Sequence, residues 1–134
     1  MTLPELPQQS GDTAQGWHPP TQLDVVRYLG AYSRELDQAT KDAAALGEEY
    51  AQSRKTYRLA YARAYLSATG TIKDREQQAV LDTADEHFHM EATEQRLKAA
   101  RERIRTLETQ IDTGRSLGAA IRAEANLAGY GGAA

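Results

Sequence analysis

The sequence predicts an all-α fold, a long antiparallel two-helix hairpin of the coiled-coil type, completed by oligomerisation and preceded by a disordered N-terminal arm. Three observations predict this fold. Apolar and small residues recur at alternating spacings of three and four along two long stretches, the pattern of helices with one buried stripe. A capping motif, "TQLD" or "TIKD", stands at the start of each helix. All four prolines lie within the first 20 residues, so no proline interrupts either helix.

The composition favours thin helix-on-helix packing over a wide globular core. Hydrophobic residues make up 40% of the 134 positions, but the chain has only one Phe and one Trp. It has no cysteine, which excludes disulfide bridges, thiolate zinc sites and thiol nucleophiles. Because 16 cationic and 19 acidic residues give a net charge of −3, the overall charge does not attract nucleic acid.

Residues 1–20 are predicted to form the disordered, proline-containing arm. Within it, Trp17 in "GWHPP" is a possible docking motif, and the alternative is that this side chain folds back onto the nearest helix. The arm lacks the basic start and the apolar run of a signal peptide, and no stretch approaches the length of a membrane span. We therefore expect a cytoplasmic chain that does not bind membranes.

The first helix is expected to run over about 21–69. Thr21 is its candidate N-cap, with Asp24 three positions later to return a hydrogen bond, and Gly70 is a natural left-handed stop. Its predicted buried stripe consists of Val25, Leu29, Tyr32, Leu36, Ala39, Ala43, Leu46, Tyr50, Ser53, Tyr57, Ala60 and Ala64.

The second helix is expected to run over about 72–128 and to be followed by a flexible, glycine-rich tail, 129–134. Its predicted buried stripe consists of Met90, Thr93, Leu97, Ala100, Ile104, Leu107, Ile111, Gly114, Gly118 and Ile121. The two glycines on this stripe mark either a close approach of the helices or a break near Gly114.

A two-residue connection makes the two helices antiparallel neighbours, which predicts a charge match between them. The stretch 54–63 holds four cations and no acid, and it would face 77–86, which holds three acids and no cation. The stretch 96–105 holds five cations and would face 35–44, where acids predominate. Exposed ion pairs of this kind set register more than stability.

The segment "RKTYRLAYARAY", residues 54–65, permits a packing interpretation and a nucleic-acid interpretation. Tyr57 lies on the buried stripe and the cations fall on different sides of the helix, which favours packing. The alternative is a recombination or replication accessory that contacts single-stranded DNA. Its possible contacts are Arg54, Lys55, Arg58, Arg96, Lys98, Arg101, Arg103 and Arg105.

The segment "DEHFHMEATE", residues 85–94, contains one Glu-x-x-His pair, Glu86 and His89, the spacing used in di-iron helical bundles. A ferritin-like metal-binding four-helix dimer is therefore an alternative, although it would need Glu48 or Glu49 as further ligands. The favoured interpretation is a solvated acidic belt, in which Glu48, Glu49, Glu91 and Glu94 face one another without cations. We expect no metal and no cofactor.

A second apolar stripe lies on the outward side of both helices. An exposed stripe on a thin hairpin usually means further association, so we expect a homo-oligomer, a dimer or higher, with a protein partner as the competing use of this face. The predicted association residues are Leu59, Leu66, Leu81, Ala84, Phe88 and Ala92.

Signatures of catalysis are missing from the sequence. It has no glycine-rich phosphate loop, no nucleophile elbow and no His-Glu-x-x-His motif. We therefore expect a non-enzymatic interaction and oligomerisation module.

Two long segments, "RKTYRLAYARAYLSATGTIKDREQQAVLDT" and "LKAARERIRTLETQIDTGRSLGAAIRAEANLAGYG", carry a resemblance. They cover residues 54–83 and 97–131 and resemble small helical proteins encoded by tailed bacteriophages, often near recombination and replication genes. The resemblance implies a phage accessory protein that acts in the host cytoplasm. It assigns no catalytic or binding residue.

Overall fold

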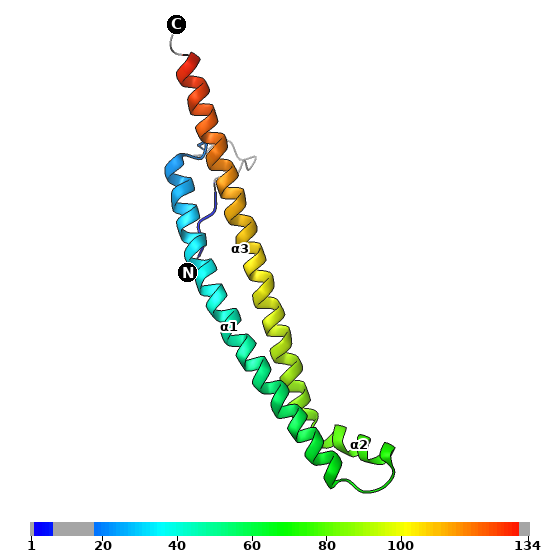
Figure 1. The fold of residues 1–134 in the computed structure, drawn as a ribbon. Helices are drawn as coiled ribbons and strands as arrows, with labels where there is room; N and C mark the ends of the chain where they lie inside the picture. Colours follow the sequence, from blue (N-terminus) through cyan, green and yellow to red (C-terminus); the bar gives the residue numbers. More distant parts are fainter. Residues whose placement is uncertain (1, 7–17, 132–134) are drawn as a thin grey trace. The chain divides into compact units, whose positions relative to one another are not determined.

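The structure is a computed structural model that describes residues 2–6 and 18–131. The chain forms helix α1 (Gln22–Ser67), helix α2 (Ile72–Asp82) and helix α3 (Ala84–Gly131), shown in Figure 1. The described residues contain no strand, and residues 2–6 and 18–20 have no regular secondary structure. The predicted all-α class with two long helices is confirmed.

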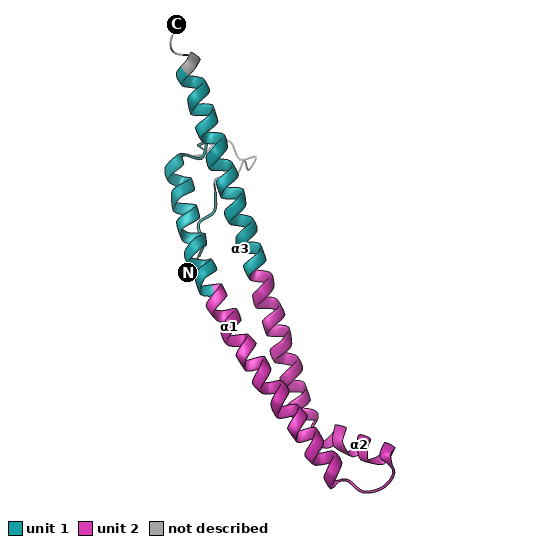
Figure 2. Cartoon of the chain, viewed as in Figure 1, with its two compact units in different colours: residues 1–38, 104–134 teal, residues 39–103 magenta. Residues whose placement is uncertain are grey.

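The chain divides into two compact units, coloured separately in Figure 2. Unit 1 comprises residues 1–38 and 104–134, and unit 2 comprises residues 39–103. Each unit therefore contains a part of α1 and a part of α3, and unit 2 also contains α2.

Two capping boxes start α1 and α2, as predicted. The hydroxyl of Thr21 accepts the backbone N–H of Asp24 at 3.2 Å, and the carboxylate of Asp24 accepts the N–H of Thr21 at 2.9 Å. Thr71 and Asp74 repeat this exchange at 3.2 and 3.1 Å. Gly70, just before the second box, takes a φ of 107°, the left-handed conformation that favours glycine. These local bonds satisfy N–H groups that the first helical turn leaves free.

In unit 1, α1 and α3 are antiparallel. Gln22 donates a hydrogen bond to the carbonyl of Gly118 at 3.0 Å, and the hydroxyl of Tyr28 donates to the side chain of Gln110 at 2.6 Å. In these two contacts the residue number rises along α1 while it falls along α3, as antiparallel helices require. The buried apolar residues here are Val25, Tyr28, Leu107 and Ile111.

In unit 2, α1 and α3 are again antiparallel. The guanidinium of Arg96 lies 3.1 Å from the carboxylate of Glu49, and the ring centroids of Tyr57 and His87 are 4.9 Å apart. Small side chains dominate the buried positions, which are Ala39, Ser53, Ala68, Ala79, Thr83, Thr93 and Leu97.

Both predicted buried stripes are confirmed. Each of their members is buried or partly buried, from Val25 to Ala64 on α1 and from Met90 to Ile121 on α3. Tyr28 was not among them, yet it is only 4% exposed. Its ring lies 4.4 Å from that of Tyr32, centroid to centroid, so the aromatic pair widens the buried surface of α1 in unit 1.

The prediction of one helix over 72–128 is wrong, because the helix is interrupted at Thr83. This residue takes φ −116° and ψ 18°, and its hydroxyl donates to the carbonyl of Ala79 at 2.6 Å. A threonine that returns a hydrogen bond to the preceding turn bends helices. The residues before it form a separate helix, α2.

The second predicted helix does not break near Gly114. Helix α3 continues through Gly114 to Gly131, so the close-approach interpretation is the one the structure supports. A Cβ atom added to Gly114 would lie 2.9 Å from side-chain carbons of Tyr28 and Leu29. Residues 129–131 of the predicted tail belong to α3, and its last three residues lie outside the described residues.

Candidate association surface

An outward stripe runs along α1 in unit 2, on the side opposite the buried stripe. Its members follow one another at spacings of four, four, three and four, and all are exposed: Ala51, Lys55, Leu59, Ala62 and Leu66. Leu59 and Leu66 are 45% and 81% exposed. The spacing is that of a helix-packing seam, but the seam has no partner within the described residues of unit 2.

A second outward stripe runs along the start of α3. Ala84 and Phe88 are exposed, Phe88 at 72%, and Ala92 is partly buried. Leu81, at the end of α2, is 76% exposed. The sequence had therefore identified residues on two outward surfaces, five of which are exposed.

Sequence reasoning missed two further exposed apolar residues of α2. Ile72 and Val80 are 70% and 50% exposed. The prediction of one helix over 72–128 gave residues 72–82 the same buried side as the rest of that helix. In the structure α2 is a separate helix with a buried side of its own, which leaves these two residues exposed. That side is marked by Ala79, which is fully buried.

The predicted pairing of the cations in 54–63 with the acids in 77–86 is wrong. No ion pair joins the two stretches, and all four cations, Arg54, Lys55, Arg58 and Arg63, are exposed. The register explains this. Tyr57 faces His87, which lies beyond the predicted stretch, because residues 72–82 turn off into α2.

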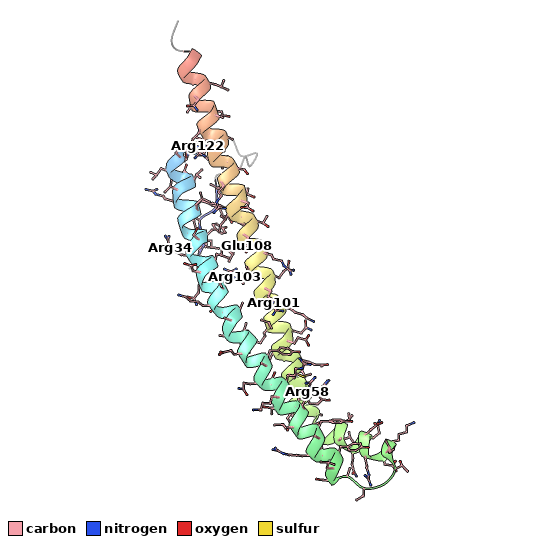
Figure 3. All side chains as sticks on the ribbon, viewed as in Figure 1. Arg34, Arg58, Arg101, Arg103, Glu108 and Arg122 are labelled. Carbon is pink, nitrogen blue, oxygen red and sulfur yellow. The ribbon has the colours of Figure 1, made fainter. Side chains whose placement is uncertain are left out.

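Three cations of α1, of which Lys55 belongs to the outward stripe, lie around one hollow. Arg54, Lys55 and Arg58 line it together with Tyr50 and Leu59, and its volume is about 470 Å³. No acid contributes to the lining. Arg58 is labelled on α1 in Figure 3. This part of α1 is a local basic surface on a chain whose net charge is negative.

The cations of 96–105 do not form one free basic surface. Arg96 pairs with Glu49, and Lys98 lies 3.4 Å from Glu94. Arg103 and Arg105 also interact with other residues. Of these five cations, only Arg101 has no partner among the described residues; Figure 3 labels it on α3.

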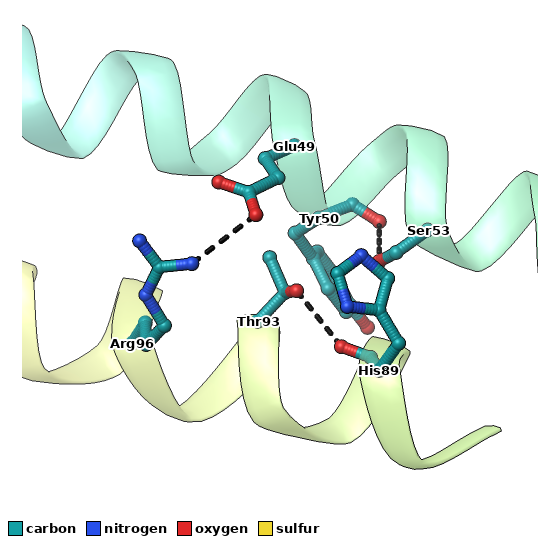
Figure 4. A network of polar contacts seen from close by, with 6 residues as sticks. All are labelled: Glu49, Tyr50, Ser53, His89, Thr93 and Arg96. Carbon is teal, nitrogen blue, oxygen red and sulfur yellow. Dashed lines mark hydrogen bonds and ion pairs between the residues drawn. The ribbon is translucent and has the colours of Figure 1, made fainter. Parts of the chain in front are cut away.

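The prediction of an acidic belt without cations is wrong. Glu49 pairs with Arg96 across the helices, and Glu94 pairs with Lys98 on α3. The imidazole of His87 lies 3.4 Å from Glu91 and pairs with it when protonated. Figure 4 shows the contact of Arg96 with Glu49 beside two hydroxyl groups that bond their own helices.

Metal ligands do not gather in one copy of the chain. Among residues 2–6 and 18–131, no group of three or more His, Asp or Glu side chains is placed to hold an ion. Glu49, one of the ligands that a ferritin-like site would need, is engaged by Arg96. Such a site would require donors from a second copy.

Two remaining predictions concern the arm and membranes. Trp17, the possible docking motif, lies outside the described residues. Within the described part of the chain, no helix combines the length and the apolar content that crossing a membrane requires. No protein-family model, curated protein or solved structure matches the chain.

Proposed function

We propose that this chain is a non-enzymatic helical module that oligomerises or binds another protein through the outward apolar residues of unit 2. The observation that carries the proposal is their exposure: Leu66, Leu81 and Phe88 are 81%, 76% and 72% exposed. Large apolar side chains that are exposed along a helix face, as these are on two outward stripes, usually mark an interaction site.

The energy available from these side chains supports association. Fully burying one Leu or Phe side chain contributes about 1.5–3 kcal/mol. Association costs two chains roughly 4–15 kcal/mol, because they lose translational and rotational freedom. Burying several of these side chains stabilises the complex by a comparable amount. Unit 2 itself has a small-residue core, with Ala79, Ser53 and Thr93 among its buried positions, so covering its outer surface would add much to its apolar burial.

The biological setting that we propose is a tailed bacteriophage. The segments 54–83 and 97–131, which resemble phage-encoded helical proteins, support this setting, and the resemblance implies action in the host cytoplasm. In that setting the module would act as an accessory to other proteins rather than as a catalyst.

A pair of matched variants tests the proposal. Changing Leu81→Glu and Phe88→Glu together should lower the molar mass measured by light scattering, because charges replace the apolar contacts. Leu127→Glu is the control, since Leu127 is 74% exposed on α3 but belongs to unit 1. Helicity should remain in both variants, because all three side chains point into solvent.

Two outcomes would contradict the proposal. One is a wild-type chain with the mass of a single copy at every protein concentration and no protein captured from host lysate. The other is an unchanged mass in the Leu81→Glu, Phe88→Glu variant of an oligomeric wild type.

A second candidate function is contact with single-stranded DNA, favoured by the hollow that Arg54, Lys55 and Arg58 line without a neutralising acid. Fluorescence anisotropy with a labelled oligonucleotide across a salt series tests it. Phosphate contacts are strongest at low salt, so a lack of binding there would eliminate this candidate.

A further inference from the structure

The two outward stripes of unit 2 carry opposite charge. On α1, Lys55 and Arg63 stand four residues to either side of Leu59 and are exposed, and the segment 51–66 contains no acid. On α3, Asp85 and Glu91 stand three residues to either side of Phe88 and are exposed, and the segment 80–92 contains no Lys or Arg. Each stripe also presents exposed apolar residues, chiefly Leu59 and Leu66 on one and Leu81 and Phe88 on the other.

These charges are not neutralised within one copy. Arg54, Lys55, Arg58 and Arg63 have no ion pair among the described residues. Asp82, Asp85 and Glu86 also have none, and the partner of Glu91 is His87, which is charged only when protonated. Each stripe therefore offers apolar area together with unpaired charge of one sign.

The two stripes face away from each other. Helices α1 and α3 of unit 2 meet along their buried stripes, as the contact of Glu49 with Arg96 and the pair Tyr57 and His87 demonstrate. Leu59 lies on the side of α1 away from this seam, and Phe88 lies on the side of α3 away from it. Each is exposed and is offset along the helical period from the buried residues of its own helix. One copy cannot bring its basic stripe onto its own acidic stripe.

From this arrangement we infer that the outward stripe of α1 binds the outward stripe of α3 on a second copy of the chain, head to tail. This inference rests on the proposed function and names the partner of the same surface. Opposite charges on the two stripes favour this pairing over α1 with α1 or α3 with α3, where like charges would meet. Because each copy keeps one stripe free, the contact is heterologous and continues into a ring or an open chain of copies.

Two single variants separate a head-to-tail contact from a symmetric one. Leu59→Asp disables the stripe of α1 and leaves that of α3 intact, whereas Phe88→Asp does the reverse. Each variant alone should have the mass of one copy, because its intact stripe finds no partner. An equimolar mixture should form a dimer and stop there, since only one productive contact remains. Light scattering and native mass spectrometry measure these masses.

The alternatives predict different masses. If α1 pairs with α1, the Phe88→Asp variant alone forms a dimer; if α3 pairs with α3, the Leu59→Asp variant does. Either result, or a mixture that remains monomeric while the wild type is oligomeric, overturns the inference and leaves the proposed function standing. A wild type that is monomeric at low salt and binds an oligonucleotide overturns the inference as well.

A second pair of variants guards against an accidental effect on folding. Leu66→Asp and Ala84→Asp lie on the same two stripes, and both positions are exposed. Their mixture should again give a dimer, whereas a mixture of Leu59→Asp with Leu66→Asp, which disable the same stripe, should stay monomeric. Raising the salt concentration should lower the mass of the wild type, because salt screens the charges around both stripes.

Discussion

Substituting Gly114 by alanine tests the close approach of α1 and α3 in unit 1. In the interior of a helix, alanine is more favourable than glycine by about 0.5–1 kcal/mol. At Gly114, however, the added Cβ would lie 2.9 Å from Leu29 Cδ2 and from two ring carbons of Tyr28. The Tyr28 ring cannot move aside at low energetic cost, because it is 4% exposed and its hydroxyl donates a hydrogen bond of 2.6 Å to Gln110.

The chain contains matched controls for this effect. Gly47 also lies within a helix, but a Cβ there would meet nothing within 4 Å, so Gly47→Ala should raise the free energy of unfolding by about 0.5–1 kcal/mol. Overpacking costs about 1–3 kcal/mol, so Gly114→Ala should lower the free energy of unfolding by roughly 0–2 kcal/mol after the helical gain is subtracted. Gly118→Ala should fall between them, because its Cβ would lie 3.1 Å from Val25 Cγ1.

The assay is urea unfolding followed by far-UV circular dichroism. The expected order of midpoints, from highest to lowest, is Gly47→Ala, Gly118→Ala and Gly114→Ala. A Gly114→Ala variant as stable as Gly47→Ala would refute the reasoning, since it would show that unit 1 has room for a methyl group between the helices.

Three further predictions concern caps and buried groups. Thr71→Ala should lower the free energy of unfolding by about 1 kcal/mol through loss of the capping box, measured by urea unfolding, whereas Thr69→Ala, in the turn, should have little effect. Hydrogen bonds from Thr21, chiefly its backbone N–H, lower the pKa of Asp24, and those from Thr71, chiefly its hydroxyl, lower the pKa of Asp74. The stability that these carboxylates contribute is therefore present above a pH of about 4 and is lost as the pH falls through their lowered pKa values. A variant with both Asp24→Asn and Asp74→Asn should lose less stability than the wild type on acidification, which thermal unfolding at a series of pH values measures. Burial raises the pKa of Tyr28, so the stability linked to its protonated hydroxyl is present below a pH of about 10 and lost above it. Tyr28→Phe should reduce that alkaline loss and should cost about 0.5–1.5 kcal/mol at neutral pH for the missing bond to Gln110, and an unchanged unfolding profile would contradict the buried hydrogen bond.

The helix starts and buried stripes were predictable because they depend on neighbouring residues. Thr21 and Asp24 are three residues apart, so they exchange hydrogen bonds as soon as the first helical turn forms, without any distant residue. The stripes follow from the helical period alone, and the exposure of Leu59 and Phe88 follows from the same period on the opposite side. The candidate surface was therefore accessible to sequence reasoning, apart from the part that α2 contributes.

The break at Thr83 could not be predicted from its residue type. Thr93, Thr109 and Thr113 return the same hydrogen bond to the preceding turn, and α3 runs through all three without interruption. Burial does not distinguish Thr83 either, since Thr93 is 1% exposed and Thr83 is 2% exposed. Thr83 differs in its backbone, whose φ of −116° and ψ of 18° end α2, and the local spacing of residue types does not encode that difference.

The predicted ion pairs failed for a related reason. A register calculated from the turn assumes that every residue after Gly70 lies on the second long helix. Residues 72–82 form the separate helix α2, so part of the stretch expected opposite 54–63 does not belong to the helix that faces α1. The acidic belt failed for another reason, which is that Arg96 of α3 pairs with Glu49 across the helices.

The sequence separation of the antiparallel contacts favours one order of folding. Glu49 and Arg96 in unit 2 are 47 residues apart, whereas Gln22 and Gly118 in unit 1 are 96 residues apart. From an unfolded chain, the longer closure costs about 0.6 kcal/mol more, since it is roughly twice as long. Once unit 2 has formed, much of the intervening chain is already ordered, so unit 1 closes over a far shorter free segment. We expect folding to start at the turn and to reach Gln22 and Gly118 last, and substitutions in unit 1 to accelerate unfolding more than they slow folding.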